Sequence, residues 1–484
     1  MLAMSSPSGI EAEKGAFNAA LAIALLSVLL ALLGAGALIL HPIPFTDEAR
    51  RHAAAAPAPE PPLLRLVGSN TIGSSLAPAL AKAYLEQRLG ARGVAIRPGL
   101  GRHDQWIEGL PEGASRPRRI EVAATGSSFA FSALERGEAD IGLSSRAITP
   151  VEIRLLAALG NMRSVKSEHI LGLDGIAVIV NPGNPITTLT LEQVARLFDG
   201  TVKNWREIGG VKQPVHRYAR NKESGTYLSF LEMVTRSHGR LARNTRYYVD
   251  SRELSEAVAA DPGAIGFVAI PYVGRAKALK LAALHHAPFA ATPLNVYRED
   301  YPLSRRLYLY TPETPANPRV ADFLDFALSP AGQALVEDAG FVGQREHPIS
   351  PPDNLHHLPE NAPRRYVELT RTADRVSFSI RFKEGEAEPD SKAWRDLPRL
   401  IQVLISPQYR KRQVILATFA GPADGTAAAR RVPPESIAKL KAELERNGLT
   451  NVKVEDFGQS LPLAPTDTSE GREKNRRIEL WLVR

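Results

Sequence analysis

Hydrophobic and polar positions follow one repeated pattern in the central part of the chain. Leu63–Val67 is a short apolar run that ends in the small polar turn Gly68–Thr71, and Leu76–Leu89 then carries apolar residues at helical spacing. The same unit recurs where the run Ile120–Ala124 is followed by small residues and by the apolar segment Phe129–Arg136. A strand, a tight turn and a helix in repeated order are typical of an α/β fold.

The C-terminal part has a different order of elements. Apolar and polar residues alternate in Val376–Phe382, which predicts a half-buried strand. The further predicted elements are, in chain order, the helix Ala393–Ile405, the strand Arg412–Phe419, the helix Glu435–Asn447 closed by Gly448, and the strands Val452–Phe457 and Arg477–Val483. This β-α-β-α-β-β order predicts a small α+β domain, a sheet with helices on one face.

One segment near the N-terminus is apolar throughout. Phe17–Leu40 carries no charged side chain, and as a helix it would span about 36 Å, enough to cross a hydrocarbon layer of about 30 Å. It is either an uncleaved transmembrane anchor or a secretory signal segment, for which Ala35–Ala37 is a candidate cleavage site. The length favours an anchor, which would lie in the inner membrane.

Two stretches rich in proline separate the parts of the chain. Ala53–Pro62 reads AAAAPAPEPP and Ser350–Arg365 reads SPPDNLHHLPENAPRR, and neither has an apolar period. The predicted organisation is an N-terminal tail (1–16), the apolar segment (17–40), a linker (41–62), a large domain (63–349), a second linker (350–365) and a small domain (366–484).

Composition excludes several classes of chemistry. The chain has no cysteine, which removes thiol nucleophiles, disulfides, iron–sulfur clusters, thiolate zinc sites and lipid attachment through cysteine. Its 60 Lys and Arg residues against 52 Asp and Glu residues give a net charge of +8, which suits an anionic ligand without requiring a nucleic-acid partner. The common hydrolase and nucleotide-binding motifs are missing, and the 11 histidines show no ligand spacing. We therefore expect no enzymatic activity, no cofactor and no metal.

Small polar turns stand at four element boundaries of the large domain. They are Gly68–Thr71, Thr125–Ser128, Asp140–Arg146 and Arg217–Thr226, and two of them carry arginine. Hydroxyls and backbone amides at a helix start are neutral donors, and an arginine adds a charged fork, so together they could desolvate a tetrahedral oxyanion. Helix capping is the alternative explanation for each turn taken alone, because Ser, Asn and Thr are common capping residues.

These turns carry a resemblance to the periplasmic phosphate-binding proteins that feed phosphate ABC transporters. The resemblance runs from about Leu64 to Gln344. Its motifs are VGSNTIGSSLAPAL from Val67, GSSFAFSALERGEADIGLSSRAIT from Gly126, LDGIAVIVNPGNPITTLTLEQVARLFDGTVKNWREIGG from Leu173, and RNKESGTYLSF from Arg220. It implies a two-lobed, type II periplasmic-binding-protein fold whose lobes close on the ligand. The expected first lobe is about 64–147 with a returning part near 264–342, and the second lobe is about 173–262.

The resemblance also implies a set of ligand residues. The matching positions, with their neighbours in the same turns, are Ser69, Asn70, Thr71, Ile72 (through its backbone), Ser127, Ser128, Ser145, Arg146, Arg220, Ser224, Gly225 and Thr226. Many phosphate-specific members place an acidic acceptor where this chain has Ser144-Ser145-Arg146, and that acceptor excludes fully ionised sulfate. Asp174 or Glu223 could replace it. Arg146 could instead point to solvent, and Arg220 could pair with Glu223 on the surface.

The C-terminal part resembles the OmpA-like peptidoglycan-binding domain. The resemblance covers about Tyr366–Arg484, and its most specific motif is FGQSLPLAPTDTSEGREKNRRIELWL from Phe457. The family holds the diaminopimelate of the peptide stem with an Asp and an Arg. Asp424 is a shifted match for the Asp, and Ser436 stands where the Arg is expected. The candidate peptidoglycan residues are therefore Asp424 with the nearby Arg430 and Arg431.

Taken together, these features predict an exported, envelope-tethered binding protein of the periplasm. Its expected partners are inorganic phosphate or a related oxyanion, an ABC permease, peptidoglycan, and the inner membrane through residues 17–40, with no nucleic acid. Uptake or sensing of phosphate is the expected role. The alternative is a structural envelope protein that contacts peptidoglycan or other proteins and has a degenerate anion site.

Overall fold

The computed structural model describes residues 60–101, 103–235, 240–282, 288–344, 349–350, 358, 361–382, 388–421, 431–464 and 469–484. The chain divides into the units Met1–Pro61 and Pro62–Arg484, and the fold described here is that of the second unit. The expected anchor or signal segment, Phe17–Leu40, lies outside the described residues. Within the described ranges, no helix has the length and apolar character needed to span a membrane.

The first lobe joins parallel strands that alternate with helices, as the pattern predicts, to a pair of antiparallel strands at its edge. Its elements are β1 (Leu64–Gly68), α3 (Asn70–Gly73), α4 (Leu76–Gln87), β2 (Arg92–Pro98), β3 (Asp104–Leu110), β4 (Arg118–Ala123), α5 (Ser127–Glu135), β5 (Ile141–Ser144), α6 (Pro150–Leu155) and η1 (Ala157–Leu159). Strand β1 is parallel to both β4 and β5. Turns that follow β1 and β5 therefore open at the same edge of the sheet.

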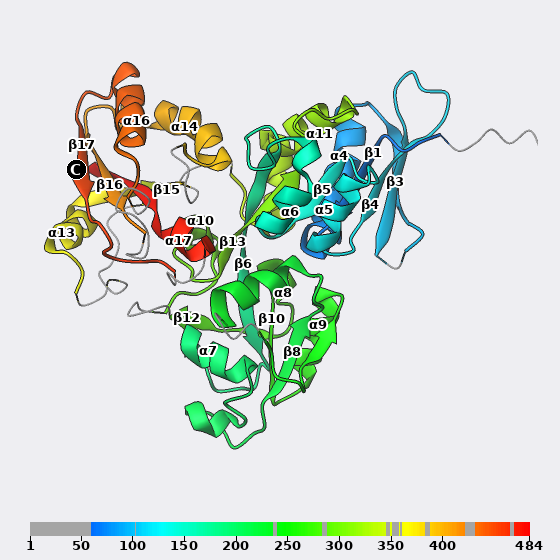
Figure 1. The fold of residues 1–484 in the computed structure, drawn as a ribbon, viewed down its shortest axis with the longest axis horizontal. Helices are drawn as coiled ribbons and strands as arrows, with labels where there is room; N and C mark the ends of the chain where they lie inside the picture. Colours follow the sequence, from blue (N-terminus) through cyan, green and yellow to red (C-terminus); the bar gives the residue numbers. More distant parts are fainter. Residues whose placement is uncertain are drawn as a thin grey trace, which may run out of the picture. The chain divides into compact units, whose positions relative to one another are not determined.

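Two long strands connect the lobes. Strand β6 (Glu168–Val180) pairs through its first half with β13 (Ser304–Tyr310) and through its second half with β10 (Ala264–Ala269). It therefore passes from the group of elements labelled β1, β4 and β5 to the group labelled β8 and β10 (Figure 1). After β13 the chain completes the first lobe with α11 (Arg319–Leu328) and α12 (Pro330–Asp338). We call β6 and β13 the hinge strands.

The second lobe holds the remaining elements between the hinge strands. They are β7 (Thr188–Thr190), α7 (Leu191–Phe198), η2 (Trp205–Ile208), β8 (His216–Arg220), α8 (Gly225–Phe230), η3 (Leu231–Thr235), β9 (Arg246–Tyr248), α9 (Ser251–Ala260), β10, η5 (Ile270–Tyr272), β11 (Lys277–Ala278), β12 (Lys280–Ala282) and α10 (Pro293–Tyr297). Strands of both lobes form one path, in the order β2-β3-β4-β1-β5-β13-β6-β10-β8-β9.

The expected lobe boundary near residue 264 is wrong. Strand β10 is parallel to β8 and antiparallel to the second half of β6, so it belongs to the second lobe. The chain returns to the first lobe only at β13. The sequence around β10 is a plain apolar run, and which strand it pairs with depends on contacts far away along the chain.

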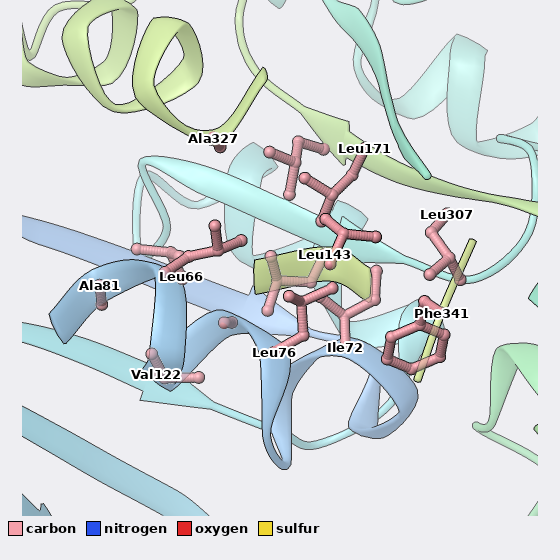
Figure 2. Close-up of a cluster of buried hydrophobic side chains, with 14 of the residues drawn as sticks. Leu66, Ile72, Leu76, Ala81, Val122, Leu143, Leu171, Leu307, Ala327 and Phe341 are labelled. Carbon is pink, nitrogen blue, oxygen red and sulfur yellow. The ribbon is translucent and has the colours of Figure 1, made fainter. Parts of the chain in front are cut away.

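A hydrophobic core fixes the first polar turn. Ile72 and Leu76 are fully buried, and Figure 2 shows them beside Leu143 of β5 and Phe341. The side chain of Ile72 thus packs in the core, and only its backbone can contact a ligand. Packing of α3 and α4 on the sheet in this way holds the turn at the end of β1 in place.

The C-terminal part forms a separate five-stranded sheet. Its elements are β14 (Ile349–Ser350), α13 (Arg364–Thr372), β15 (Ala373–Arg381), α14 (Ser391–Leu404), β16 (Gln413–Phe419), α16 (Pro434–Arg446), β17 (Val452–Asp456), α17 (Ser469–Asn475) and β18 (Arg477–Val483). The sheet order is β14-β15-β18-β16-β17. The predicted strands and helices all form, within two or three residues of the expected ends.

Helices cover both faces of this sheet, which differs from the expected single face. One buried cluster joins the sheet to α14 and α16, through residues such as Leu400 and Leu444. A second cluster joins the opposite face to α13, through Tyr366, Leu369 and Trp481. Helix α13 begins at Arg364, directly after Pro363, so its first two residues lie within the stretch assigned to the linker.

Candidate anion site between the lobes

Polar turns from both lobes meet at the hinge strands. The Thr71 hydroxyl of α3 lies 3.0 Å from the Thr226 hydroxyl of α8. The Ser229 hydroxyl donates to the carbonyl of Ser145 at 3.4 Å, and the Tyr272 hydroxyl donates to the carbonyl of Thr71 at 2.9 Å. Residues from the first, third and fourth polar turns, up to 155 positions apart in the sequence, therefore lie together where the two lobes meet. We call this region the cleft.

Ser127 and Ser145 form the floor of this cleft on the first lobe. The Ser127 hydroxyl accepts from the backbone amide of Ser145 at 3.1 Å and lies 3.3 Å from its hydroxyl. Gly225 of the second lobe packs so closely that a β-carbon there would clash with both hydroxyl oxygens. Ser128 stands beside them, half-buried at the start of α5. Glycine at position 225 thus allows the two lobes to close on each other.

Ser69 and Asn70 are buried without partners for their side chains. They are 1% and 4% exposed. Neither the Ser69 hydroxyl nor the Asn70 amide has a hydrogen-bond partner among the described residues. Ser69 is the N-cap residue of α3, yet its side chain makes no capping bond. Burial of such groups costs free energy unless a partner is bound, which favours a ligand role over capping.

Helix capping does account for part of the last turn. The Ser224 hydroxyl accepts from the backbone amides of Thr226 and Tyr227 at 3.2 and 3.4 Å. Ser224 is therefore the N-cap of α8. Its hydroxyl proton is still available for an acceptor in the cleft.

Arg220 is a buried cation without a carboxylate partner among the described residues. It is 1% exposed, and its guanidinium donates to the Ser251 hydroxyl at 2.5 Å and to the carbonyls of Val249 and Tyr248 at 2.5 and 3.4 Å. Burial lowers the pKa of Arg220 to about 10, so the group is still charged near neutral pH. The alternative of a surface pair with Glu223 does not hold, because Arg220 is buried and donates to these three acceptors, whereas the Glu223 carboxylate accepts from Asn221.

Arg146 has a different environment. It is buried, and its guanidinium forms a two-pronged ion pair with Glu152 at 2.5 and 2.8 Å. One of the same nitrogens lies 3.4 Å from the Ser128 hydroxyl. The charge of Arg146 is therefore matched within the first lobe, and the side chain does not point to solvent.

The structure brings in a second guanidinium, Arg305, which sequence reasoning did not find. It lies on β13, is almost fully buried, and reaches the carbonyl of Ser145 at 3.2 Å and the Thr71 hydroxyl at 3.5 Å. Its partner is Asp174 of β6, whose Oδ2 accepts from Nε at 2.9 Å and from Nη2 at 2.7 Å. The only sequence signal was an arginine pair directly before the apolar run 307–310.

Asp174 is not placed as a free acceptor. Its second oxygen, Oδ1, accepts from the backbone amide of Ile270 at 3.3 Å. Burial raises the pKa of Asp174 above its usual value, and the adjacent Arg305 opposes that shift. Two hydrogen bonds from the Arg305 guanidinium favour the charged form of this carboxylate.

The assembled groups suit a tetrahedral oxyanion. Hydroxyls come from both lobes, and Arg220 adds a buried guanidinium that has no direct ion pair. Among the described residues of the cleft, no serine or threonine hydroxyl is hydrogen-bonded to a histidine that could act as its base. The described residues contain no group of His, Asp or Glu side chains that could hold a metal ion.

The candidate peptidoglycan residues are described only in part. Asp424 and Arg430 lie outside the described residues, and Arg431 is exposed. Ser436, at the position expected for arginine, is buried in α16.

Comparison with known proteins matches the two-lobed part. A profile of the PBP superfamily domain matches residues 103–331, which extend over both lobes. The phosphate-binding protein PstS of Pseudomonas aeruginosa is 32% identical over 241 residues, 46% of this chain and 73% of that protein. PstS of Borreliella burgdorferi is 25% identical over 231 residues, 46% of this chain and 80% of that protein.

Among solved structures, an ABC-type phosphate transport receptor from Vibrio cholerae aligns with a TM-score of 0.44 and 23% identity, over 58% of this chain and 99% of that one. The curated relatives are binding proteins and not enzymes. With nearly a third of positions identical over most of a PstS protein, this chain belongs to the PstS family of phosphate-binding proteins.

Proposed function

We propose that the two-lobed part binds inorganic phosphate, or a closely similar tetrahedral oxyanion, in the cleft between its lobes. The observation that carries this proposal is Arg220, a buried guanidinium matched only by neutral acceptors among the described residues. A bound anion would supply the missing negative charge. The unpartnered side chains of Ser69 and Asn70 would donate to it or accept from it.

Binding would work by closure of the hinge, with no covalent step. Donors to the anion come from the first lobe, through Ser127, and from the second, through Thr226 and Arg220. A ligand between them therefore stabilises the closed state in proportion to its contacts with both lobes.

Neutral oxygen atoms would accept the hydrogen bond that the proton of hydrogen phosphate donates. Both oxygens of Asp174 already accept hydrogen bonds, and Glu223 is engaged with Asn221. Serine and threonine hydroxyls can accept as well as donate hydrogen bonds, so they can accept the hydrogen bond that the P–O–H group donates. They discriminate less against sulfate than a free carboxylate does.

The proposed cellular role is based on the relatives and on the sequence motifs. We propose that the protein acts outside the cytoplasm and delivers phosphate to an ABC permease or reports its level. Residues 17–40 would anchor it in the inner membrane. An OmpA-like domain in residues 366–484 would associate with the cell wall, and the alternation of strands and helices from β15 to β18, with α17 as an additional helix before β18, supports that assignment.

Calorimetry tests the anion proposal directly. The suitable protein is residues 62–484, because buried ion pairs such as Arg306–Asp390 and Arg375–Asp300 join the C-terminal part to the lobes. Titration with phosphate should give one binding event per chain, and Arg220→Gln should weaken it by about two orders of magnitude. No heat with phosphate, sulfate or arsenate would refute the proposal and leave a structural envelope protein as the better description.

The cell-wall proposal needs its own experiment. The same protein should sediment with purified peptidoglycan sacculi, and Asp424→Ala together with Arg430→Ala should release it. Failure of the unaltered protein to sediment would favour a domain that contacts other proteins.

A further inference from the structure

The charges that line the cleft are almost, but not completely, balanced. Arg146 is paired with Glu152, and Arg305 is paired with Asp174. Arg220 has no carboxylate within ion-pair distance among the described residues. The guanidiniums of the cleft therefore outnumber their directly paired carboxylates by one, and Asp250 acts on Arg220 only from beyond ion-pair distance.

Asp174 is the carboxylate through which this excess is controlled. We propose that Asp174, which lies behind Arg305 on the neighbouring hinge strand, limits the positive charge of the cleft and so sets its preference between singly and doubly charged oxyanions. The inference rests on the proposed anion binding and assigns a specificity-determining role to a residue that does not itself touch the ligand.

The geometry supports an electrostatic role in addition to a positioning one. Asp174 Oδ2 accepts from both Nε and Nη2 of Arg305, and the side chains are 0% and 1% exposed. Arg305 Nη1 and Nη2 then face the Ser145 carbonyl and the Thr71 hydroxyl, the same groups that meet the second lobe. At this depth a unit charge is weakly screened, so Asp174 lowers the potential that any anion experiences.

The pair is also independent of closure. Asp174 and Arg305 are direct neighbours in the antiparallel register of β6 and β13. Both strands belong to the sheet that continues through the hinge, so the carboxylate stays beside the guanidinium whether the lobes are open or closed. Its effect on the cleft is therefore a constant property of the site.

A series of variants of residues 62–484 separates charge from shape. Arg305→Gln lowers the charge of the cleft by one unit, Asp174→Asn raises it by one unit, and the double variant restores it. Asparagine and glutamine keep the approximate size and hydrogen-bonding ability of the originals. Asp396→Asn is the matched control, because it removes a buried carboxylate that pairs with Lys392 in α14, away from the cleft.

Calorimetric titrations with sulfate and with phosphate give the readout. Asp174→Asn should bind the sulfate dianion at least about tenfold more tightly than the wild type, and should shift the sulfate-to-phosphate ratio by a similar factor. Arg305→Gln should weaken both anions, the double variant should return sulfate affinity toward the wild-type value, and Asp396→Asn should leave both affinities unchanged.

The opposite result is equally clear. If Asp174 only positions Arg305, Asp174→Asn will weaken sulfate and phosphate together and leave their ratio unchanged, and the inference is wrong. Sulfate affinity in Arg305→Gln equal to that of the wild type would also overturn it, without depending on the folding of the Asp174 variant. A wild-type protein that binds neither anion would instead refute the proposed function itself.

Discussion

Arg305 and Arg306 are consecutive residues of the hinge strand β13, and they form ion pairs on opposite sides of it. Arg305 pairs with Asp174 in the cleft, whereas Arg306 pairs with Glu299 at 3.2 Å and with Asp390 of the C-terminal part at 2.5 Å. Successive side chains of a strand point to opposite faces. The strand that carries one guanidinium of the cleft is therefore also a docking strand for the C-terminal part.

Further buried contacts hold the C-terminal part against the segment that precedes β13. Arg381 pairs with Glu299 at 2.6 Å, Arg375 pairs with Asp300 at 3.0 Å, and Lys474 donates to the carbonyl of Tyr301 at 3.1 Å. Charged groups buried in this way are stable only as complete networks, because one missing partner leaves an uncompensated charge.

Arg220→Gln should separate binding from stability. We expect phosphate affinity to fall by about two orders of magnitude, because a charge-assisted donor is lost. The free energy of unfolding without anion should change by no more than about 1 kcal/mol, because the buried guanidinium has only neutral partners. Arg146→Gln is the comparison: its charge is already matched by Glu152, so it should reduce affinity far less. Equal losses in the two variants would contradict the charge assignment.

Ser69→Ala and Ser224→Ala should have opposite effects on stability. The Ser69 hydroxyl is buried without a partner among the described residues, so its removal should raise the free energy of unfolding by about 1 kcal/mol while weakening phosphate binding. The Ser224 hydroxyl caps α8, so its removal should lower that free energy by about 1 kcal/mol. Chemical denaturation without phosphate measures both. A loss of stability in Ser69→Ala would show that the hydroxyl has a structural partner.

Gly225→Ala should prevent full closure of the cleft. The added methyl group would clash with the hydroxyls of Ser127 and Ser145 across the lobes. We expect weaker phosphate binding by at least about tenfold and loss of the compaction that the proposed closure predicts on addition of phosphate, measured by small-angle X-ray scattering. Gly183→Ala, in an exposed loop of the second lobe, is the control and should compact normally. Normal compaction in both variants would show that the closed state does not require the close contact of Gly225 with Ser127 and Ser145.

Acid should weaken the attachment of the C-terminal part. Burial tends to raise the pKa values of Glu299 and Asp390, but the adjacent arginines lower both overall. The folded state therefore binds fewer protons than the unfolded state. This contribution to stability is fully present above the unfolded pKa values of about 4 and is lost as the pH falls below them.

Asp390→Asn tests that pH dependence. The amide can still cap α14, as Asp390 does through the amide of Ala393, but it cannot match the charge of Arg306. Urea unfolding at neutral pH should show a loss of about 1–3 kcal/mol, and the further loss between about pH 5 and about pH 3 should be smaller than in the wild type. An acid response equal to that of the wild type would exclude this pair as its source.

The local sequence pattern was sufficient to predict the secondary-structure elements and several of the polar turns that meet in the cleft. Alternation and helical spacing predicted the strands and helices of the C-terminal part, because burial on one face repeats with the period of each element. The small polar turns after β1, β4 and β8 could be recognised because turn residues act within a few positions. These turns supplied Ser69, Thr71 and Arg220.

Tertiary structure alone decided which charges are matched. Arg146 and Arg220 look equivalent in the sequence, but only the fold pairs one of them with Glu152 and places the other among neutral acceptors. Arg305 and Asp174 lie 131 positions apart and meet through strand register. Strand pairing and charge compensation depend on contacts between distant segments, whereas periodicity is local, so the sequence by itself determined the elements and the fold determined the electrostatics of the site.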